Sequence, residues 1–326
     1  MKKSDVVALG ELLVDFTENG INAQGSPVFE ANPGGAPCNV LSMLQRLGKK
    51  TAFIGKVGND SFGRMLKNVT DGQGIDTSNL IFDAKVHTTL AFVHTAPDGE
   101  RSFSFYRNPG ADMMLREDEI DFSLIQNTKL FHFGSLSMTA PGAENATKAA
   151  VKAAKEAGAV VSFDPNLRPP LWDSMDTAKE KIAYGTSQCD ILKISDDEIE
   201  FFTGTEDIDQ GAARIQERYN VPFICATMGK RGSRAYYNGI KVECAPFLND
   251  DTIETTGAGD TFMACVLSWI LDYGIEGMDS HRIHDMLGFA NAAASIITTR
   301  KGALKVMPEE EEVWNFIQER RKCEQR

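Results

Sequence analysis

Short apolar runs alternate with longer stretches of helical spacing along most of this chain. The apolar runs lie at residues 5–10, 51–58, 130–136, 159–166, 189–195 and 222–229, and the clearest helical stretches at 36–48, from Asp60 onward, and at 142–158. Strands separated by helices in this way build βαβ units around a sheet that is covered on both faces. We therefore predict an α/β fold with a mostly parallel, doubly covered sheet.

One segment departs from this alternation. Residues 88–108, "TTLAFVHTAPDGERSFSFYRN", contain two runs of period 2 on either side of the turn signal at 96–100. This pattern predicts an antiparallel hairpin, which does not fit in a parallel core. We expect it to form a small β-sheet lid from segments at about 11–33 and 88–110. No linker or repeat divides the chain, so we expect one domain over residues 1–326.

The composition limits the classes of partner. A chain of 326 residues with 42% hydrophobic content can bury a large core, and its net charge of −12 argues against nucleic acid or an acidic membrane surface. The amino-terminal apolar run is too short for a signal peptide or a membrane span, so we expect a cytoplasmic protein. The six cysteines show no zinc-site spacing, and His94 and His132 are interpreted as structural.

Polar residues follow several of the predicted strands. They are Asp15, Asp164 with Asn166, Lys193 with Ser195, and Thr227 with Gly229. Ligands of open parallel sheets bind beyond the carboxyl ends of the strands, so these residues should lie along one ligand-binding edge.

The stretch "ETTGAGDTF" at 254–262 places a Gly-Ala-Gly turn directly before an apolar helical run. Backbone N–H groups at a helix amino terminus, together with the helix dipole, favour the binding of an anion such as phosphate. Asp260 follows this turn, although a carboxylate would repel a phosphate. It is either a helix cap or a base beside a phosphate-binding turn, as phosphoryl transfer to an alcohol requires.

Two other nucleotide sites are disfavoured. The chain has no GxxxxGK[ST] sequence, which excludes a Walker-type phosphate loop. The turn at 257–259 has Phe262 where a dinucleotide fold would have its third glycine, and a second helical stretch follows instead of a strand. A dehydrogenase is therefore a remote alternative.

Several motifs resemble those of one known family. "PGGAPCN" at 33–39, "GKVGNDSFG" at 55–63 and "TTGAGD" at 255–260 together resemble the signature regions of the ribokinase-like carbohydrate kinases. "GELLVDF" at 10–16, "FYRNPGADMML" at 105–115 and "FDPNLRPPLW" at 163–172 are more narrowly similar to the fructokinase branch. The resemblance covers nearly the whole chain.

The resemblance implies roles for the site residues. Asp260 would accept the proton of the sugar hydroxyl, while the N–H groups of Gly257, Ala258 and Gly259 would stabilise the transferring phosphoryl group. For the sugar, the matching residues are Asp15, Gly34, Gly35, Asn39, Arg107 and Arg168.

The nucleotide side is implied in the same way. ATP would contact Lys193, Ser195, Thr227, Gly229, Gly232 and Asn291, with Glu198 organising Mg²⁺ through water. Two positions depart from the family pattern. Ser195 stands where Asn is usual, and Glu254 stands where an Asp that helps to bind a monovalent cation such as K⁺ is usual, which leaves K⁺ dependence open.

We therefore expect an ATP-dependent sugar kinase, with D-fructose phosphorylated at its terminal O6, and a homodimer that forms through the lid. Within the class, the alternatives are a 2-keto-3-deoxygluconate kinase, which the arginine pair would also suit, and a pentose kinase. From another class, a catalytically silent sugar-binding sensor stays open. The intact Asp260 and Gly-Ala-Gly turn disfavour it.

Overall fold

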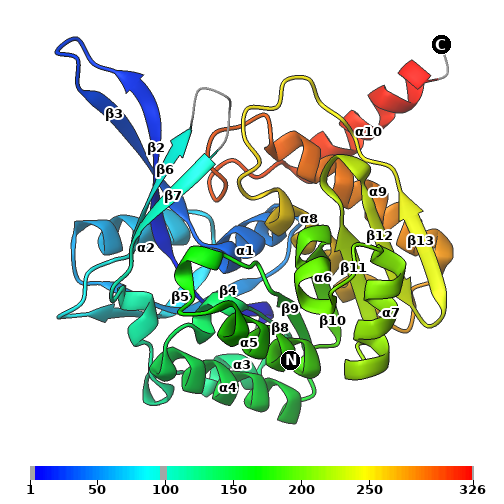
Figure 1. The fold of residues 1–326 in the computed structure, drawn as a ribbon, viewed down its shortest axis with the longest axis horizontal. Coiled ribbons are helices and arrows are strands. Elements are labelled where there is room, and N and C mark those ends of the chain that lie inside the picture. The colour runs from blue at the N-terminus through cyan, green and yellow to red at the C-terminus, as the bar shows by residue number, and fades with distance from the viewer. Residues whose placement is uncertain (1–3, 96–100, 325–326) are drawn as a thin grey trace.

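The computed structural model describes residues 4–95 and 101–324, and its core is one large sheet (Figure 1). The strand order is β13-β12-β11-β10-β9-β8-β1-β4-β5, with parallel pairing from β11 through β5 and antiparallel pairing only for β12 and β13. The strands are β1 (Ser4–Leu9), β4 (Thr51–Gly58), β5 (Asp76–Asp83), β8 (Thr128–Gly134), β9 (Val160–Asp164), β10 (Ile191–Ser195), β11 (Phe223–Thr227), β12 (Ser233–Tyr237) and β13 (Ile240–Cys244).

Helices cover both faces of this sheet, as alternating side chains of a buried strand require. Val6 and Ala8 of β1 pack in one hydrophobic cluster, and Val7 and Leu9 in the other. The first cluster includes α1 (Ala36–Arg46), α2 (Ser61–Gly72), α8 (Ala258–Tyr273), α9 (Ser280–Ile297) and α10 (Glu310–Glu324). The second includes α3 (Phe122–Gln126), α4 (Pro141–Glu156), α5 (Met175–Gln188), α6 (Asp196–Thr203) and α7 (Ile208–Tyr219). The predicted mostly parallel, doubly covered sheet is confirmed.

A second, smaller sheet stands away from the core at the upper left of Figure 1. Its strand order is β3-β2-β6-β7, built from β2 (Leu13–Ile21), β3 (Pro27–Gly34), β6 (Leu90–Thr95) and β7 (Arg101–Tyr106). β6 and β7 pair antiparallel, as the sequence predicts, and the expected turn at 96–100 lies outside the described residues. The predicted small lid sheet is therefore confirmed, with its strands within residues 13–34 and 90–106.

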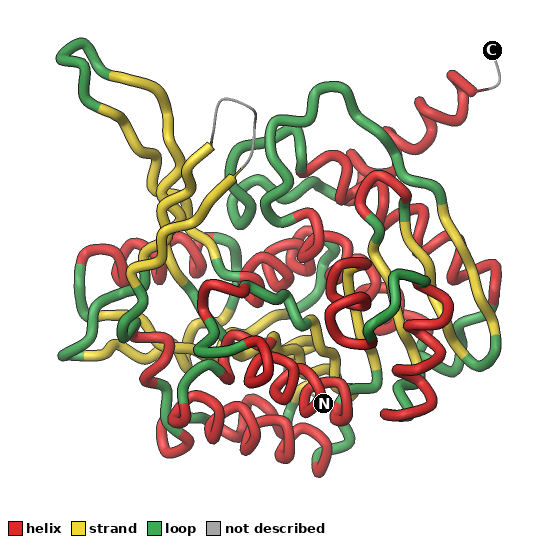
Figure 2. The backbone as a smooth tube through the Cα atoms, in the orientation of Figure 1, coloured by secondary structure: helices red, strands yellow, loops and turns green. Residues whose placement is uncertain are grey.

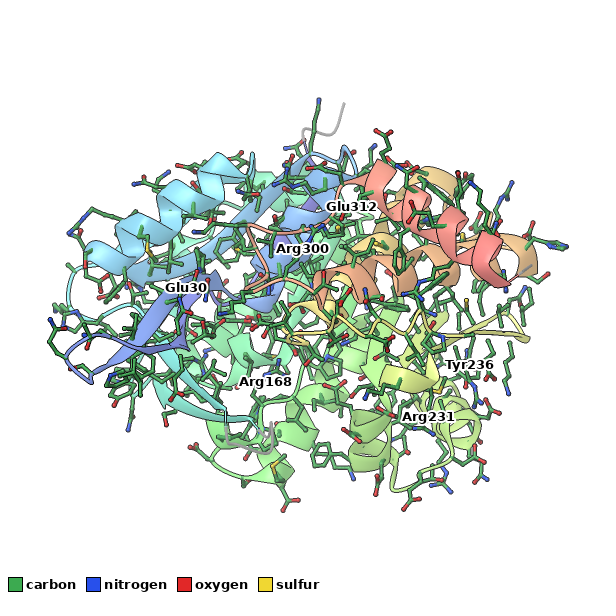
Figure 3. The ribbon with its side chains drawn as sticks, turned by 90° about the horizontal axis from the view of Figure 1, so that it is seen from above. Glu30, Arg168, Arg231, Tyr236, Arg300 and Glu312 are labelled. Carbon is green, nitrogen blue, oxygen red and sulfur yellow. The ribbon has the colours of Figure 1, made fainter. Side chains whose placement is uncertain are left out.

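Long loops gather between this lid sheet and the start of α8 (Figure 2). One runs from β13 to α8, and another from α9 to α10. Arg300 in the second loop pairs with Glu312 of α10, and the two are side by side in Figure 3. These loops lie beyond the carboxyl end of β10, where a ligand site of a parallel sheet is expected.

The core explains the cysteines and His132, to which the sequence assigns no catalytic or metal-binding role. Cys38, Cys189, Cys225, Cys244 and Cys265 are buried and unpaired, as small apolar side chains would be. His132 is buried and shares a hydrogen bond of 2.9 Å between its Nδ1 and the Ser162 hydroxyl, and burial lowers its pKa to about 3. Within residues 4–95 and 101–324, no helix has the length and apolar character needed to span a membrane.

Candidate active site

The amino terminus of α8 fixes the centre of the site. Gly257 precedes the helix with φ 78°, a left-handed conformation that favours glycine. A Cβ at this position would lie 2.6 Å from the Cβ of Ala303, so the turn also needs glycine for space. The Ala258 N–H donates to the carbonyl of Thr255 at 3.2 Å, which closes the turn before the helix.

Asp260 does not behave as a simple helix cap. Its Oδ2 accepts a hydrogen bond of 2.8 Å from Nδ2 of Asn39 on α1, and both side chains are buried. Burial raises the pKa of Asp260 to about 6 and Asp164 raises it further, while the hydrogen bond from Asn39 and the charges of Lys193 and Arg168 lower it. A carboxylate held in this way is a suitable general base near neutral pH.

A cavity of about 350 Å³, here called the lid cavity, lies between the lid sheet and Asp260. Of the predicted sugar residues, its wall includes Asp15, Gly35, Asn39, Arg107 and Arg168. Gly34 is not on the wall. A Cβ there would lie 2.1 Å from Oδ2 of Asp15, so Gly34 instead makes room for that carboxylate.

Asp15 extends from β2 of the lid into this cavity. Burial raises its pKa to about 7, Arg168 lowers it, and Glu254 and Asp260 raise it. The lid thus carries an acceptor whose protonation changes close to neutral pH.

The two predicted arginines differ. Arg107 is buried, and its Nε donates to Oδ2 of Asp112 at 2.8 Å, while its Nη groups donate to the Thr139 hydroxyl and the Leu136 carbonyl at 2.8 and 3.0 Å. Arg168 is exposed at the cavity rim, near the middle of the molecule in Figure 3, and its Nη1 donates to the Leu167 carbonyl at 3.1 Å. Arg168 is therefore the freer of the two.

A buried carboxyl supports the start of α1. Oε1 of Glu11 accepts a hydrogen bond of 2.9 Å from the N–H of Ala36, the first residue of that helix. Burial raises the pKa of Glu11 to about 7. Gly35 has φ 125°, and a Cβ there would lie 2.4 Å from the Glu11 carbonyl oxygen, so this turn also requires glycine.

A second cavity of about 570 Å³, here called the loop cavity, lies on the other side of the α8 start, beside the loop that follows β13. Its wall includes all six predicted nucleotide residues: Lys193, Ser195, Thr227, Gly229, Gly232 and Asn291. Ala258 also lines it.

Asn291 in the loop cavity uses its amide within the protein. Its Oδ1 accepts from the Ser233 hydroxyl at 2.9 Å, and its Nδ2 donates to the Ala245 carbonyl at 3.0 Å. Gly232 has φ 88°, and a Cβ there would lie 2.2 Å from the Cys244 carbonyl oxygen. Both residues thus shape the wall through the segment that follows β13.

The two cavities meet at three residues, because Lys193, Thr255 and Gly259 line both. A group held in one cavity at this junction would face a group held in the other. Asp260, whose position follows Gly259, lines the lid cavity at the same point.

Glu198 and Ser195 form a helix cap. The Ser195 N–H donates to Oε2 of Glu198 at 2.8 Å, and the Glu198 N–H donates back to the Ser195 hydroxyl at 3.3 Å, which is a capping box at the start of α6. Oε1 of Glu198 accepts from the Leu167 N–H at 2.8 Å. Glu198 lines neither of the two cavities, but its hydrogen bonds to Ser195, which lines the loop cavity, place it directly behind that wall.

Sequence reasoning did not assign a role to Glu11, Asp112 or Thr255. Glu11 and Asp112 stand within the quoted motifs, but their partners lie across the fold or on a separate turn. Asp164 is the last residue of β9 and Asn166 follows the strand, as the ligand-edge argument predicts, and Asn166 lines the lid cavity. Within the described residues, no three His, Cys, Asp or Glu side chains cluster as a metal site.

Comparisons with known proteins identify the family of this chain. The model of the pfkB family carbohydrate kinases matches residues 3–310. The chain is 42% identical over 317 residues to Probable fructokinase-2 of Arabidopsis thaliana, with 97% of this chain and 96% of the relative covered.

Two solved structures are similar over nearly their whole length. The fructokinase of Xylella fastidiosa with bound ATP has a TM-score of 0.89 and 29% identity, covering 98% of this chain and 99% of that one. The fructokinase of Vibrio cholerae O395 in its fructose, ADP and calcium ion bound form has a TM-score of 0.87 and 30% identity, covering 97% and 100%. The chain therefore belongs to the pfkB family of carbohydrate kinases.

Proposed function

We propose that this enzyme transfers the γ-phosphoryl group of ATP to the terminal O6 of D-fructose. The observation that carries the proposal is the placement of Asp260, which accepts from Asn39 and lines the lid cavity where this meets the loop cavity. The sugar would occupy the lid cavity and ATP the loop cavity. The similarity to fructokinases, one of which is solved with fructose and ADP, supports this assignment.

The chemistry follows from these positions. Asp260 would take the proton of the attacking hydroxyl, which converts a weak nucleophile into a stronger one. The N–H groups of Gly257 and Gly259 at the start of α8 would stabilise the phosphoryl oxygens, since the helix dipole favours negative charge there. The N–H of Ala258, in contrast, donates to the Thr255 carbonyl within the turn. Closure of the lid sheet over the sugar would exclude the water that could otherwise accept the phosphoryl group.

The charges of the lid cavity favour a neutral sugar over a sugar acid. Its wall includes the carboxyl groups of Asp15, Glu254 and Asp260, while the guanidinium of Arg107 is already paired with Asp112 at 2.7 Å. A carboxylate ligand would face these acids, while the cations of the cavity are already partly paired with carboxylates of the protein. A ketohexose can donate to Asp15 and accept from Arg168, so each group gains a partner.

Magnesium would accompany the nucleotide. Mg²⁺ is usually held by one or two carboxylates, by waters and by the phosphates of its substrate, so the absence of a three-ligand cluster in the described residues fits this mode. Each Glu198 oxygen keeps a second lone pair beyond its N–H partner, which could accept from a metal-bound water. When bound, Mg²⁺ neutralises phosphate charge.

A monovalent cation such as K⁺ is a further proposal, which concerns Glu254. Oε1 of this buried residue accepts a hydrogen bond of 2.8 Å from the Gly302 N–H, and Glu254 directly precedes Thr255 in the same loop. Activity measured in potassium chloride against a tetramethylammonium salt of equal ionic strength tests it.

A sugar panel with product mapping tests the main proposal. ADP release would be measured with D-fructose, D-ribose, D-glucose and 2-keto-3-deoxygluconate, and the phosphorylated position identified by NMR. We expect fructose 6-phosphate, with kcat/KM at least about tenfold above ribose and glucose. A higher kcat/KM for 2-keto-3-deoxygluconate would assign the acid sugar instead. Sugar binding without ADP release would indicate a sensor.

We also propose a homodimer through the outer face of the lid sheet. The ring of Phe92 stacks on that of Phe16 with 4.9 Å between the ring centroids, and its centroid lies 5.5 and 5.3 Å from those of Phe29 and Tyr106. Tyr106 is nevertheless 66% exposed. An exposed aromatic face on a small sheet is suited to a second copy. Light scattering would give twice the chain mass, and a strictly monomeric protein would contradict the dimer.

Unpaired buried cysteines support a reducing compartment, the cytoplasm.

A further inference from the structure

The arginine that follows the last lid strand has its charge balanced inside the protein. Arg107 comes directly after β7 and lines the lid cavity. Its Nε and Nη2 lie 2.8 and 2.7 Å from Oδ2 of Asp112, and the two side chains are only 3% and 2% exposed. A free guanidinium on a cavity wall would attract a carboxylate. The ion pair with Asp112 opposes that attraction, because the carboxylate already occupies the place of an anionic ligand.

Asp112 is itself held by both strands of the lid hairpin. Its Oδ1 accepts a hydrogen bond of 2.5 Å from the Thr89 hydroxyl, while its Oδ2 pairs with Arg107. Thr89 precedes β6 and Arg107 follows β7, so one carboxylate bridges the two segments that enter the hairpin, here called the lid base (residues 88–89 and 107–112). The Ala111 N–H donates to the His87 carbonyl at 2.9 Å, which fixes the short helix that carries Asp112.

A glycine makes room for this cluster. A Cβ at residue 110 would lie 1.8 Å from Oγ1 of Thr89, 2.7 Å from Oδ1 of Asp112 and 2.9 Å from Cγ of Arg107. Any larger residue at Gly110 would therefore push the ion pair apart. Gly110 and Asp112 both lie in the stretch "NPGAD" at 108–112, and neither has another role in the proposed function.

The remaining contacts of Arg107 limit what it can offer to a ligand. Its Nη1 donates to the Thr139 hydroxyl at 2.8 Å, and its Nη2 donates to the Leu136 carbonyl at 3.0 Å. Together with Asp112, these partners take at most four of the five guanidinium N–H groups. One N–H of a charge-balanced arginine is enough for a sugar hydroxyl, whereas a carboxylate gains most from a free guanidinium that it contacts with both oxygens.

The other ionisable groups of the lid cavity do not add a free cation beside this pair. Glu11 lies next to it: burial has the largest effect on the pKa of Glu11 and raises it, and the two charges of the pair shift this pKa in opposite directions. Lys193 pairs with Asp164 at 3.0 Å, and Arg168 lies at the rim. The cavity wall also includes three further carboxyl groups, those of Asp15, Glu254 and Asp260.

We propose that Asp112 is a specificity-determining residue: by neutralising Arg107 at the lid base, its carboxylate makes the sugar site select neutral sugars and reject sugar acids. This inference rests on the proposed kinase function and names the residue that sets the charge of its substrate. Asp112 acts through Arg107 and is therefore a positioning residue. A neutral sugar loses little by this arrangement, because a hydroxyl accepts a hydrogen bond without needing a net positive charge.

The test is Asp112→Asn, which removes the charge but keeps a side chain of the same shape that can still contact Thr89 and Arg107. kcat/KM would be measured with D-fructose and with 2-keto-3-deoxygluconate, and the Kd of each sugar by calorimetry without ATP. The ratio of kcat/KM for the acid to that for fructose should rise by about 10- to 100-fold over the wild type, because the arginine becomes free to pair with the carboxylate. The Kd values should shift in the same sense.

Asp60→Asn is the matched control. Asp60 accepts from the N–H and the hydroxyl of Thr88 at 2.9 and 2.8 Å, so it also holds the lid base, but it does not line the lid cavity. This variant should lower the thermal midpoint and leave the ratio of acid to fructose within about threefold of the wild type. A purely structural role of Asp112 would predict the same result for Asp112→Asn.

The double variant Asp112→Asn with Arg107→Met shows whether the effect passes through the arginine. Both charges are removed together, so neither stays buried without a partner. The ratio of acid to fructose should return to within about threefold of the wild type, because the charge of Arg107 is already balanced in the wild-type protein.

Three outcomes would overturn the assignment. The first is a folded Asp112→Asn protein whose ratio stays within about threefold of the wild type. The second is a raised ratio that persists in the double variant. If Asp112→Asn does not fold, the double variant decides: a ratio near that of the wild type supports the proposal, and a fall of more than about tenfold would show that Arg107 already serves the acid.

Failure of the sugar assignment gives a different result. A wild-type protein that prefers 2-keto-3-deoxygluconate would refute the fructose assignment, whereas the role of Asp112 is tested by the change in the ratio between variant and wild type. The calorimetric Kd values give the same comparison without any phosphoryl transfer.

Discussion

The lid cavity and the loop cavity share a junction but are built from different chemistry. The lid cavity is lined by ionisable side chains, among them Glu11, Asp15 and Asp260, and burial raises the pKa of each. The loop cavity is lined more by backbone turns, amides and apolar groups such as Phe247 and Phe262. The contrast indicates that ionisable side chains provide chemistry and selectivity on the sugar side, whereas backbone shape dominates on the nucleotide side.

This contrast leads to a general expectation about the effects of mutations in the two cavities. Single side-chain changes in the lid cavity should have large effects, because each removes a buried charge with fixed partners. Changes in the loop cavity should have smaller effects, because a mutation cannot delete a backbone N–H or carbonyl.

The largest effect is expected for Asp260→Asn. It should lower kcat by about 10² to 10⁴, the range for loss of a general base, while sugar and ATP affinities stay within a few-fold. Steady-state kinetics and calorimetric binding measure both. Asp272→Asn, at the exposed far end of the same helix, is the control and should keep kcat. Near-normal turnover in Asp260→Asn would return Asp260 to the role of a helix residue.

The second expectation concerns pH and the stability of the ligand-free protein. The folded-state pKa values of Asp15 and Asp260, about 7 and about 6, lie above the ordinary value of 3.8 for an aspartate. The folded state therefore binds more protons, and the stability from these groups is full below about pH 4 and is lost as pH rises through 6 to 7. At about 1.4 kcal/mol per pKa unit, this contribution is up to about 4 kcal/mol for Asp15 and about 3 kcal/mol for Asp260.

Urea unfolding of wild type and Asp15→Asn at pH 5 and pH 8 measures this effect. The free energy of unfolding of Asp15→Asn should fall less between the two pH values than that of the wild type. Equal pH slopes would mean that Asp15 is not buried as a neutral acid, and the contrast between the cavities would lose one of its supports.

The same contrast explains how much the sequence could predict. The turn at Gly257 and the base at Asp260 are contiguous in sequence, so a local motif identified them. The partner of Arg107 was not identified, because Asp112 reaches it across the turn between β7 and the short helix Ala111–Met114. Asn39 and Asp260 are 221 residues apart, and only the fold brings them together.

Two local signals were available but were not used. Ser195 and Glu198 have the spacing of a capping box, and the structure shows that cap, whereas the sequence interpretation assigned them to nucleotide and metal. Asn238 and Gly239 form the Asn-Gly turn between β12 and β13, with φ values of 47° and 76°. These two strands and β5 were not among the predicted strands.

A smaller effect is expected for the arginine at the cavity rim. Arg168→Met should raise the KM for fructose by about 10- to 100-fold, because a charge-assisted hydrogen bond contributes about 1.5 to 3 kcal/mol. The KM for ATP should change by less than threefold. Arg116→Met, which removes an exposed arginine paired with Asp118, is the control. An equal loss toward ATP would place Arg168 on the nucleotide and weaken the contrast.

The smallest effect is expected in the loop cavity, for Asn291→Ala. The Asn291 amide donates to the Ala245 carbonyl and accepts from the Ser233 hydroxyl, so its loss should let the segment after β13 shift. Each lost hydrogen bond contributes about 1 kcal/mol, so the KM for ATP should rise by about 3- to 10-fold, with the KM for fructose unchanged. Ser233→Ala, which removes only one of these bonds, should have a smaller effect in the same assay. A rise of more than about 100-fold in the KM for ATP would contradict the contrast. It would show that a single side chain, rather than the shape of the backbone, dominates nucleotide binding.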